Sequence, residues 1–181
     1  MSGMKVAVAL AILVATVSSA RAESLVFRGD EFVRKYESGN DKARLVEFIP
    51  PNENLQNWTK LIGYRAVFDS RQTPAEAAAV VGALASQRYG GAKPRVLTKG
   101  DEAIVEFVAK APGSDVVEYN VFKYAPGEGG RGIVSFQYAH RFRGLDPDGA
   151  RELGARWVAD AAAYDMSRVR ATTARRGSAA F

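Results

Sequence analysis

The sequence predicts a single α+β domain in which a mainly antiparallel sheet is flanked by two amphipathic helices. Short runs of strand-forming residues, separated by turn-rich segments, recur between residues 42 and 142. Two other segments show helical spacing of apolar residues behind clear capping signals. The last three strand-like runs follow one another with only short turns between them, which predicts an antiparallel meander. The expected order is strand, strand, helix, strand, strand, strand, helix.

The first two strands are predicted from alternating apolar side chains. Residues 42–49 place Val46 and Phe48 on one face, with Leu45 and Ile49 on the other. Two prolines then end this strand. The next strand, at residues 58–68, is expected to present one shared apolar face made of Trp58, Ile62, Tyr64, Ala66 and Phe68.

The first helix has a well-marked start. Thr73 can cap it, Pro74 suits its first position, and Glu76 completes a capping box. Two glycines at residues 90 and 91 end it. Helical spacing predicts a buried stripe made of Ala77, Val80, Val81 and Leu84.

The three strands of the meander are predicted at residues 103–109, 116–124 and 133–142. Asp146 then caps a second helix, with Pro147 behind it. The face of this helix that should pack on the sheet comprises Ala150, Leu153, Trp157, Ala161 and Tyr164.

The N-terminus has the pattern of a signal peptide over residues 1–22. Lys5 precedes an apolar run at residues 6–17, and Ala20-Arg21-Ala22 offers small residues at the positions that a signal peptidase reads. An uncleaved membrane anchor is the alternative, although a spanning helix needs about 20 apolar residues and this run is shorter. We therefore expect a periplasmic or secreted protein, with no transmembrane span in the mature chain.

The rest of the chain is expected to divide into three parts. They are an N-terminal lead-in at residues 23–41, the α+β domain at residues 42–169, and a flexible basic tail at residues 170–181. An arginine cluster lies in and just before this tail. These arginines could be solvated, or they could touch an anionic membrane surface weakly. The members of the cluster are Arg168, Arg170, Arg175 and Arg176.

Composition excludes several classes of function. The chain has no cysteine, so disulfides, thiol catalysis and cysteine metal sites are ruled out. The formal net charge of +5 decreases when Lys5 and Arg21 leave with the signal peptide. A mildly basic surface of this kind predicts no nucleic-acid partner. We expect neither a cofactor nor a metal.

Two resemblances add to this interpretation. The order of elements between Lys42 and Val169 resembles the PsbP-like fold, an antiparallel sheet flanked by helices. The segment ENLQNWTKLI, residues 53–62, is similar to one in uncharacterised exported proteins of Gram-negative bacteria. Together they imply an exported, non-catalytic domain, and they transfer no functional residue.

His140 is the single histidine and the candidate catalytic residue. Alternation places it on the apolar face of its strand, where a structural role is the alternative. A general base would need an orienting carboxylate, for which Asp146 or a nearby glutamate is the candidate. Four further acids are expected on solvated strand faces: Glu102, Glu106, Asp115 and Glu118.

The candidate binding residues are Trp58, Tyr64, Tyr138 and Arg131. The aromatic side chains could line a pocket or belong to the core, and Arg131 lies in a glycine-rich loop that could contact a partner. The leading hypothesis is an exported, periplasmic, non-catalytic binding or accessory protein for an unknown protein or small apolar ligand. The alternatives are a small envelope hydrolase that uses His140, or envelope-surface association through the arginine-rich tail.

Overall fold

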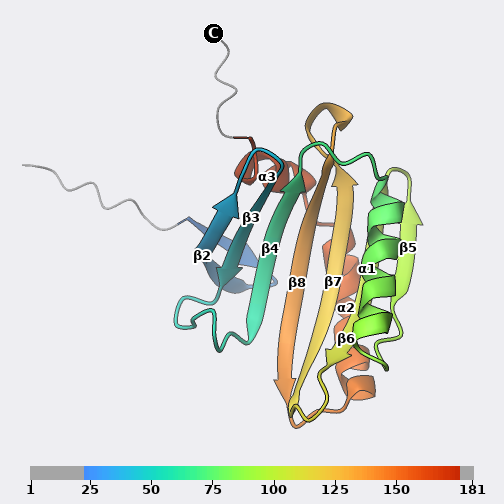
Figure 1. The fold of residues 1–181 in the computed structure, drawn as a ribbon. Helices are drawn as coiled ribbons and strands as arrows, with labels where there is room; N and C mark the ends of the chain where they lie inside the picture. Colours follow the sequence, from blue (N-terminus) through green and yellow to red (C-terminus); the bar gives the residue numbers. More distant parts are fainter. Residues whose placement is uncertain (1–22, 176–181) are drawn as a thin grey trace, which may run out of the picture.

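The computed structural model describes residues 23–175. The predicted signal peptide, residues 1–22, and the end of the predicted tail, residues 176–181, lie outside this range. Eight strands form one antiparallel sheet in the order β1-β2-β3-β4-β8-β7-β6-β5 (Figure 1). They are β1 (Ser24–Phe27), β2 (Asp30–Gly39), β3 (Ala43–Ile49), β4 (Lys60–Val67), β5 (Arg95–Lys99), β6 (Glu102–Lys110), β7 (Val116–Pro126) and β8 (Ile133–Arg143).

Three helices accompany the sheet: α1 (Pro74–Arg88), α2 (Pro147–Ala162) and α3 (Met166–Thr172). The predicted capping box is confirmed, because the Thr73 hydroxyl accepts from the Glu76 backbone N–H while the Glu76 carboxylate accepts from the Thr73 N–H. The carboxylate of Asp146 caps α2 by accepting from the Gly149 N–H at 2.7 Å.

The helices cover different faces of the sheet. In Figure 1, α1 lies on the front face and α2 on the back face. Val105 and Phe107 of β6 share a core cluster with Ala78 of α1. Val108 of the same strand belongs to the main cluster, which contains Trp157 of α2. The strands β6 and β7 are therefore sandwiched between two helices.

The other half of the sheet is closed on the back only. The sheet curls, so that Phe27 of β1 lies 5.3 Å from Phe136 and 5.2 Å from Tyr138 of β8, measured between ring centroids. With α3, this curl closes the back face over β3, β4 and β8. Within residues 23–175, no helix packs across the front face of these three strands (Figure 1).

The predicted class is confirmed: the protein is a single α+β domain with one antiparallel sheet. Three strands and one helix are additional to the predicted order. The lead-in at residues 23–41 forms β1 and β2, and β5 is a further edge strand. Residues 170–175 of the predicted tail complete α3 and continue beyond it, with Thr173 buried, so this part of the predicted tail packs against the domain.

The predicted buried stripe of α1 is wrong at two positions. Val80 is 45% exposed and Leu84 is 57% exposed. The buried residues are Ala77, Ala78, Gly82 and Ala85. A Cβ atom added at Gly82 would lie 3.6 Å from the side chain of Val105 in β6, so α1 contacts the sheet through its smallest residues.

Three single placements also differ from prediction. Trp58 does not share a face with Ile62, because it precedes β4 in a loop and packs on the front side with Leu61. Leu153 of α2 is 40% exposed instead of buried. Glu106 is buried on the back face, where it accepts a hydrogen bond from the hydroxyl of Tyr119 and pairs with Arg95.

Candidate functional site

A ladder of polar side chains crosses the front face where α1 leaves it open. The side-chain amide of Gln137 donates to Asn120 at 3.0 Å, and the amide of Asn120 donates to Glu118 at 3.0 Å. Arg141 donates through Nε to the same Glu118 carboxylate at 2.9 Å. Register explains the grouping, because Asn120, Gln137 and their neighbours alternate onto the same face of adjacent strands.

The loop between β3 and β4 borders this ladder, and its own side chains hold it in place. The carboxylate of Glu53 accepts from the backbone N–H of Thr59 at 2.7 Å and from the Thr59 hydroxyl. Asn54 accepts from the N–H of Gln56 at 3.0 Å. Trp58 anchors the loop to the sheet through a small apolar cluster whose other members are Ile49, Leu61, Ala139 and Leu55.

Arg141 links the loop to the polar ladder. Its guanidinium lies over the ring of Trp58, 3.5 Å from the ring centroid, while its Nε is bound to Glu118. No residue in the described range accepts a hydrogen bond from its terminal η nitrogens. Arg141 is therefore fixed at one end and has free donors at the other.

Trp58, Glu118 and Arg141 line a cavity of about 500 Å³, which we call the Trp58 cavity. Its lining comes from the β3–β4 loop, the C-terminal end of α1, the β6–β7 turn and the neighbouring ends of β6, β7 and β8. Figure 1 shows these elements at the lower end of the front face. The size of the cavity falls within the usual range for small-molecule sites. Its lining comprises Gln56, Asn57, Trp58, Thr59, Tyr89, Ala109, Ala111, Ser114, Val116, Glu118, Arg141 and Arg143.

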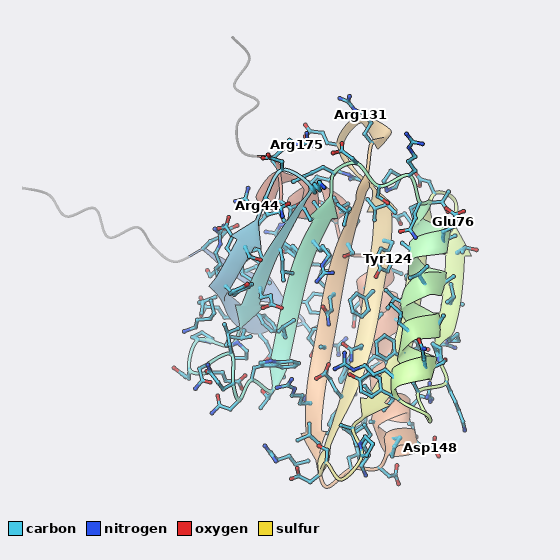
Figure 2. All side chains as sticks on the ribbon, viewed as in Figure 1. Arg44, Glu76, Tyr124, Arg131, Asp148 and Arg175 are labelled. Carbon is cyan, nitrogen blue, oxygen red and sulfur yellow. The ribbon has the colours of Figure 1, made fainter. Side chains whose placement is uncertain are left out.

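A smaller cavity of about 220 Å³ lies at the opposite end of the sheet, beside Arg131 (Figure 2). The glycine-rich loop packs closely against the backbone there, because a Cβ atom on Gly132 would clash with the carbonyl oxygen of Phe68. Two of the lining arginines are already engaged. Arg170 donates to the Pro126 carbonyl at 3.0 Å, and Arg175 pairs with Asp69 at 3.0 Å. These engaged arginines hold the last residues of the domain in place.

His140 lies on the back face, as its alternation predicts. It stacks on Phe142 at 4.4 Å and on Trp157 at 5.0 Å, between ring centroids. Burial, helped by the nearby charge of Lys60, lowers the pKa of His140 to about 4, so the ring is neutral near pH 7. Its buried Nδ1 has no hydrogen-bond partner within residues 23–175.

Neither cavity described above contains His140, and Asp146 is engaged in capping α2. The hydrolase hypothesis stays a prediction.

The other predicted binding residues lie apart from one another. Tyr64 and Tyr138 are both 2% exposed and belong to the main core cluster of the back face. Their hydroxyl-bearing rings pack in the interior, where Tyr64 shares a hydrogen bond with Tyr164. Of the four predicted residues, Trp58 alone lines the Trp58 cavity.

Sequence reasoning missed the side chains that accompany Trp58. Glu118 was expected to be a solvated strand charge, and neither Arg141 nor Tyr89 was singled out. One signal was available: Glu118 and Arg141 stand on strands predicted to be neighbours, with opposite charges that could pair across them.

The comparisons with known proteins identify a family without adding a function. Within residues 23–175, no helix is long and apolar enough to cross a membrane, and no group of three or more histidine or acidic side chains could hold a metal ion. No curated protein and no solved structure matches the chain. Residues 20–163 match the model of an uncharacterised family of bacterial proteins, and the chain belongs to that family.

Proposed function

We propose that this chain is an exported, periplasmic, non-catalytic binding protein whose ligand occupies the Trp58 cavity. The observation that carries the proposal is the position of Arg141. Its guanidinium carbon lies over the Trp58 ring, 3.5 Å from the ring centroid, and its Nε is bound to Glu118, while its terminal donors stay free beside a cavity of about 500 Å³. Preorganised donors next to an aromatic surface are typical of small-molecule sites.

The lining suggests the chemistry of the ligand. The free η nitrogens of Arg141 favour an acceptor group, a carboxylate or an amide carbonyl. The apolar part of the lining, with Tyr89 and Val116, favours an apolar group on the same molecule. The amide and hydroxyl groups of the β3–β4 loop can bond further polar atoms. A small amphipathic organic molecule with a carboxylate or carbonyl group fits these three features.

Export is supported by residues 1–22 and by the resemblance of residues 53–62 to exported proteins of Gram-negative bacteria. The same segment supplies Trp58 and Thr59 to the cavity. The proposed location and the proposed site therefore depend on the same short stretch of sequence.

Native mass spectrometry of the mature chain, purified gently from the periplasm of its own host, tests the proposal. We expect a reproducible extra mass of a few hundred daltons, on the order of the mass that a cavity of this size accommodates. The Arg141→Ala variant should lose that mass, because it removes the free donors and the cover of Trp58.

Arg131→Ala is the matched control, since it removes an arginine from the other cavity. It should keep the extra mass, and thermal unfolding of both variants should show that each remains folded. A bare wild-type chain, or equal retention by Arg141→Ala, would refute binding in the Trp58 cavity.

A further inference from the structure

The outer surface of α1 is apolar, which is unusual for an exposed helix. Between Ala77 and Gln87 the helix has no charged residue, although Val80 and Leu84 are 45% and 57% exposed. A helix that is apolar on every side is normally buried on every side. In this domain only the side that carries Ala78 and Gly82 faces the sheet.

The exposed residues form a regular stripe. Glu76, Val80, Leu84 and Arg88 are spaced four residues apart, so they follow one ridge along the helix. We call them the α1 stripe. Its two ends carry opposite charges, an acid in the first turn and a base in the last turn. Its centre is apolar.

Both charged ends have capacity for a further partner. In the capping box, Glu76 accepts both Thr73 hydrogen bonds through Oε2, which leaves Oε1 available. Arg88 lies over the ring of Tyr89 at 5.6 Å from the centroid and has no ion pair within residues 23–175.

We propose that the α1 stripe is a self-association surface on which a second copy of this chain packs its own α1 in antiparallel orientation. Glu76 and Arg88 are equally distant from Gly82 along the helix, and so are Val80 and Leu84. A two-fold axis that crosses the α1 stripe midway between Val80 and Leu84, at the level of Gly82 along the helix, therefore places Val80 of one copy against Leu84 of the other. The same axis brings Glu76 of each copy to Arg88 of the other.

Charge complementarity selects a second copy over other partners. A helix that lies on a membrane carries lysine and arginine on its polar side, whereas this stripe is neutral with one charge of each sign. An acid at one end and a base at the other are complemented by an antiparallel copy of the same arrangement. The 15-residue helix is about 22 Å long, so the contact is small and the dimer should be weak.

Sedimentation velocity of the mature chain from about 10 µM to about 1 mM tests the proposal, because a weak dimer forms within this range. We expect the wild-type dimer fraction to increase with concentration. Leu84→Glu should weaken the dimer at least tenfold, on the order of 1.4 kcal/mol, by placing two carboxylates in the apolar centre. Glutamate is a good helix former, so the variant should fold.

Leu153→Glu is the matched control, because it makes the same change at a 40% exposed leucine on α2. It should leave the dimer unchanged. A chain that stays monomeric at about 1 mM, or a dimer that both variants weaken equally, would overturn the proposal.

The absence of cysteine from the chain allows a second test of the register. A mixture of Val80→Cys and Leu84→Cys proteins should form a mixed disulfide faster than Leu153→Cys forms its own. Equal rates would exclude the antiparallel arrangement.

Discussion

The sheet has two differently covered halves. The covered half, with β6 and β7, has a helix on each face, whereas the uncovered half, with β3, β4 and β8, is closed on its back face only. Every residue of β6 from Ala103 to Ala109 is buried, because α1 covers the front and α2 the back. In β3, by contrast, Val46 and Phe48 are buried while Glu47 between them is partly exposed. Burial of every successive residue thus marks a strand covered on both faces, and alternating burial marks a strand covered on one.

Charged groups follow the same division. In the covered half, Lys123 is 4% exposed and Glu106 is 3% exposed, and both are satisfied by specific partners. In the uncovered half, Arg65 of β4 is exposed and has no ion pair within the described residues. The covered half therefore buries charged groups only with specific partners, whereas the uncovered front face leaves the charge of Arg65 exposed to solvent.

The largest predicted effect comes from adding one methyl group to the covered half. A Cβ atom at Gly154 of α2 would lie 2.3 Å from the ring of Tyr119, which is fully buried. Gly154→Ala should lower the free energy of unfolding by about 2 kcal/mol or more, even after the gain of about 1 kcal/mol in helix propensity. Urea denaturation measures this change.

The same substitution on the uncovered front face should cost much less. A Cβ atom at Gly63 of β4 would lie 3.2 Å from Oε1 of Gln137, the end of a flexible side chain. Gly63→Ala should change stability by less than about 1 kcal/mol. Gly90→Ala, with no atom within 4 Å of the new Cβ, is the control for the procedure. Equal losses at Gly154 and Gly63 would show that the two halves do not differ in packing.

A second pair of variants removes one cationic side chain from each half of the sheet. Nζ of Lys123 donates to the carbonyls of Ala162 at 2.8 Å and Tyr164 at 3.1 Å, and pairs with Glu102 at 3.0 Å. Lys123→Met leaves these acceptors unpaired and should cost about 1–3 kcal/mol. Arg65→Met removes an exposed, unpaired cation and should stay within about 0.5 kcal/mol. Thermal unfolding of both variants checks the order, and a larger loss for Arg65→Met would reverse it.

The difference in cover between the two halves of the sheet also explains which strands and helices can be predicted from the sequence. Alternation or apolar runs located β3, β4, β6, β7 and β8, because each of those strands buries several apolar side chains on at least one face. Capping residues located the starts of α1 and α2 for local reasons, since Thr73 and Asp146 bond within their own first turn. The strand β5 carries no such signal because all of its residues are exposed. Its pairing with β6 is what makes it a strand.

Packing depth and the site were less predictable. Periodicity gives the spacing of a helical stripe but not which of two apolar sides meets the sheet, and α1 is apolar on both. The side that meets the sheet is the one with the smaller residues, Ala77, Ala78, Gly82 and Ala85. The Trp58 cavity combines the β3–β4 loop, the end of α1 and three strands. Residues that far apart in the chain produce no local motif, so Trp58 was found as an aromatic residue and Arg141 was not found.

A further stability loss is predicted on the covered back face, and it depends on pH. The pKa of His140 falls from 6.5 to about 4 on folding because of burial, so the unfolded chain binds the proton more tightly. Stability from this group is complete above pH 6.5 and is lost as the pH falls from 6.5 toward 4. Because the ring is partly exposed, we expect a loss of only about 1 kcal/mol.

His140→Phe keeps the aromatic stacking and cannot titrate. Its free energy of unfolding, measured by urea denaturation between pH 7 and pH 4.5, should fall less steeply than that of the wild type. Identical slopes would mean that the environment of His140 does not disfavour the charged ring.

The most direct test of ligand binding on the uncovered front face uses the two tryptophans as internal reporters. Trp58 lines the front cavity, whereas Trp157 is buried on the back face. In a ¹⁵N–¹H spectrum, each gives a separate indole signal that can be followed as a low-molecular-weight extract of the host periplasm is added. Binding in the Trp58 cavity predicts that the Trp58 indole signal shifts and saturates while the Trp157 signal stays in place. Two unchanged signals, or a shift at Trp157 alone, would contradict it.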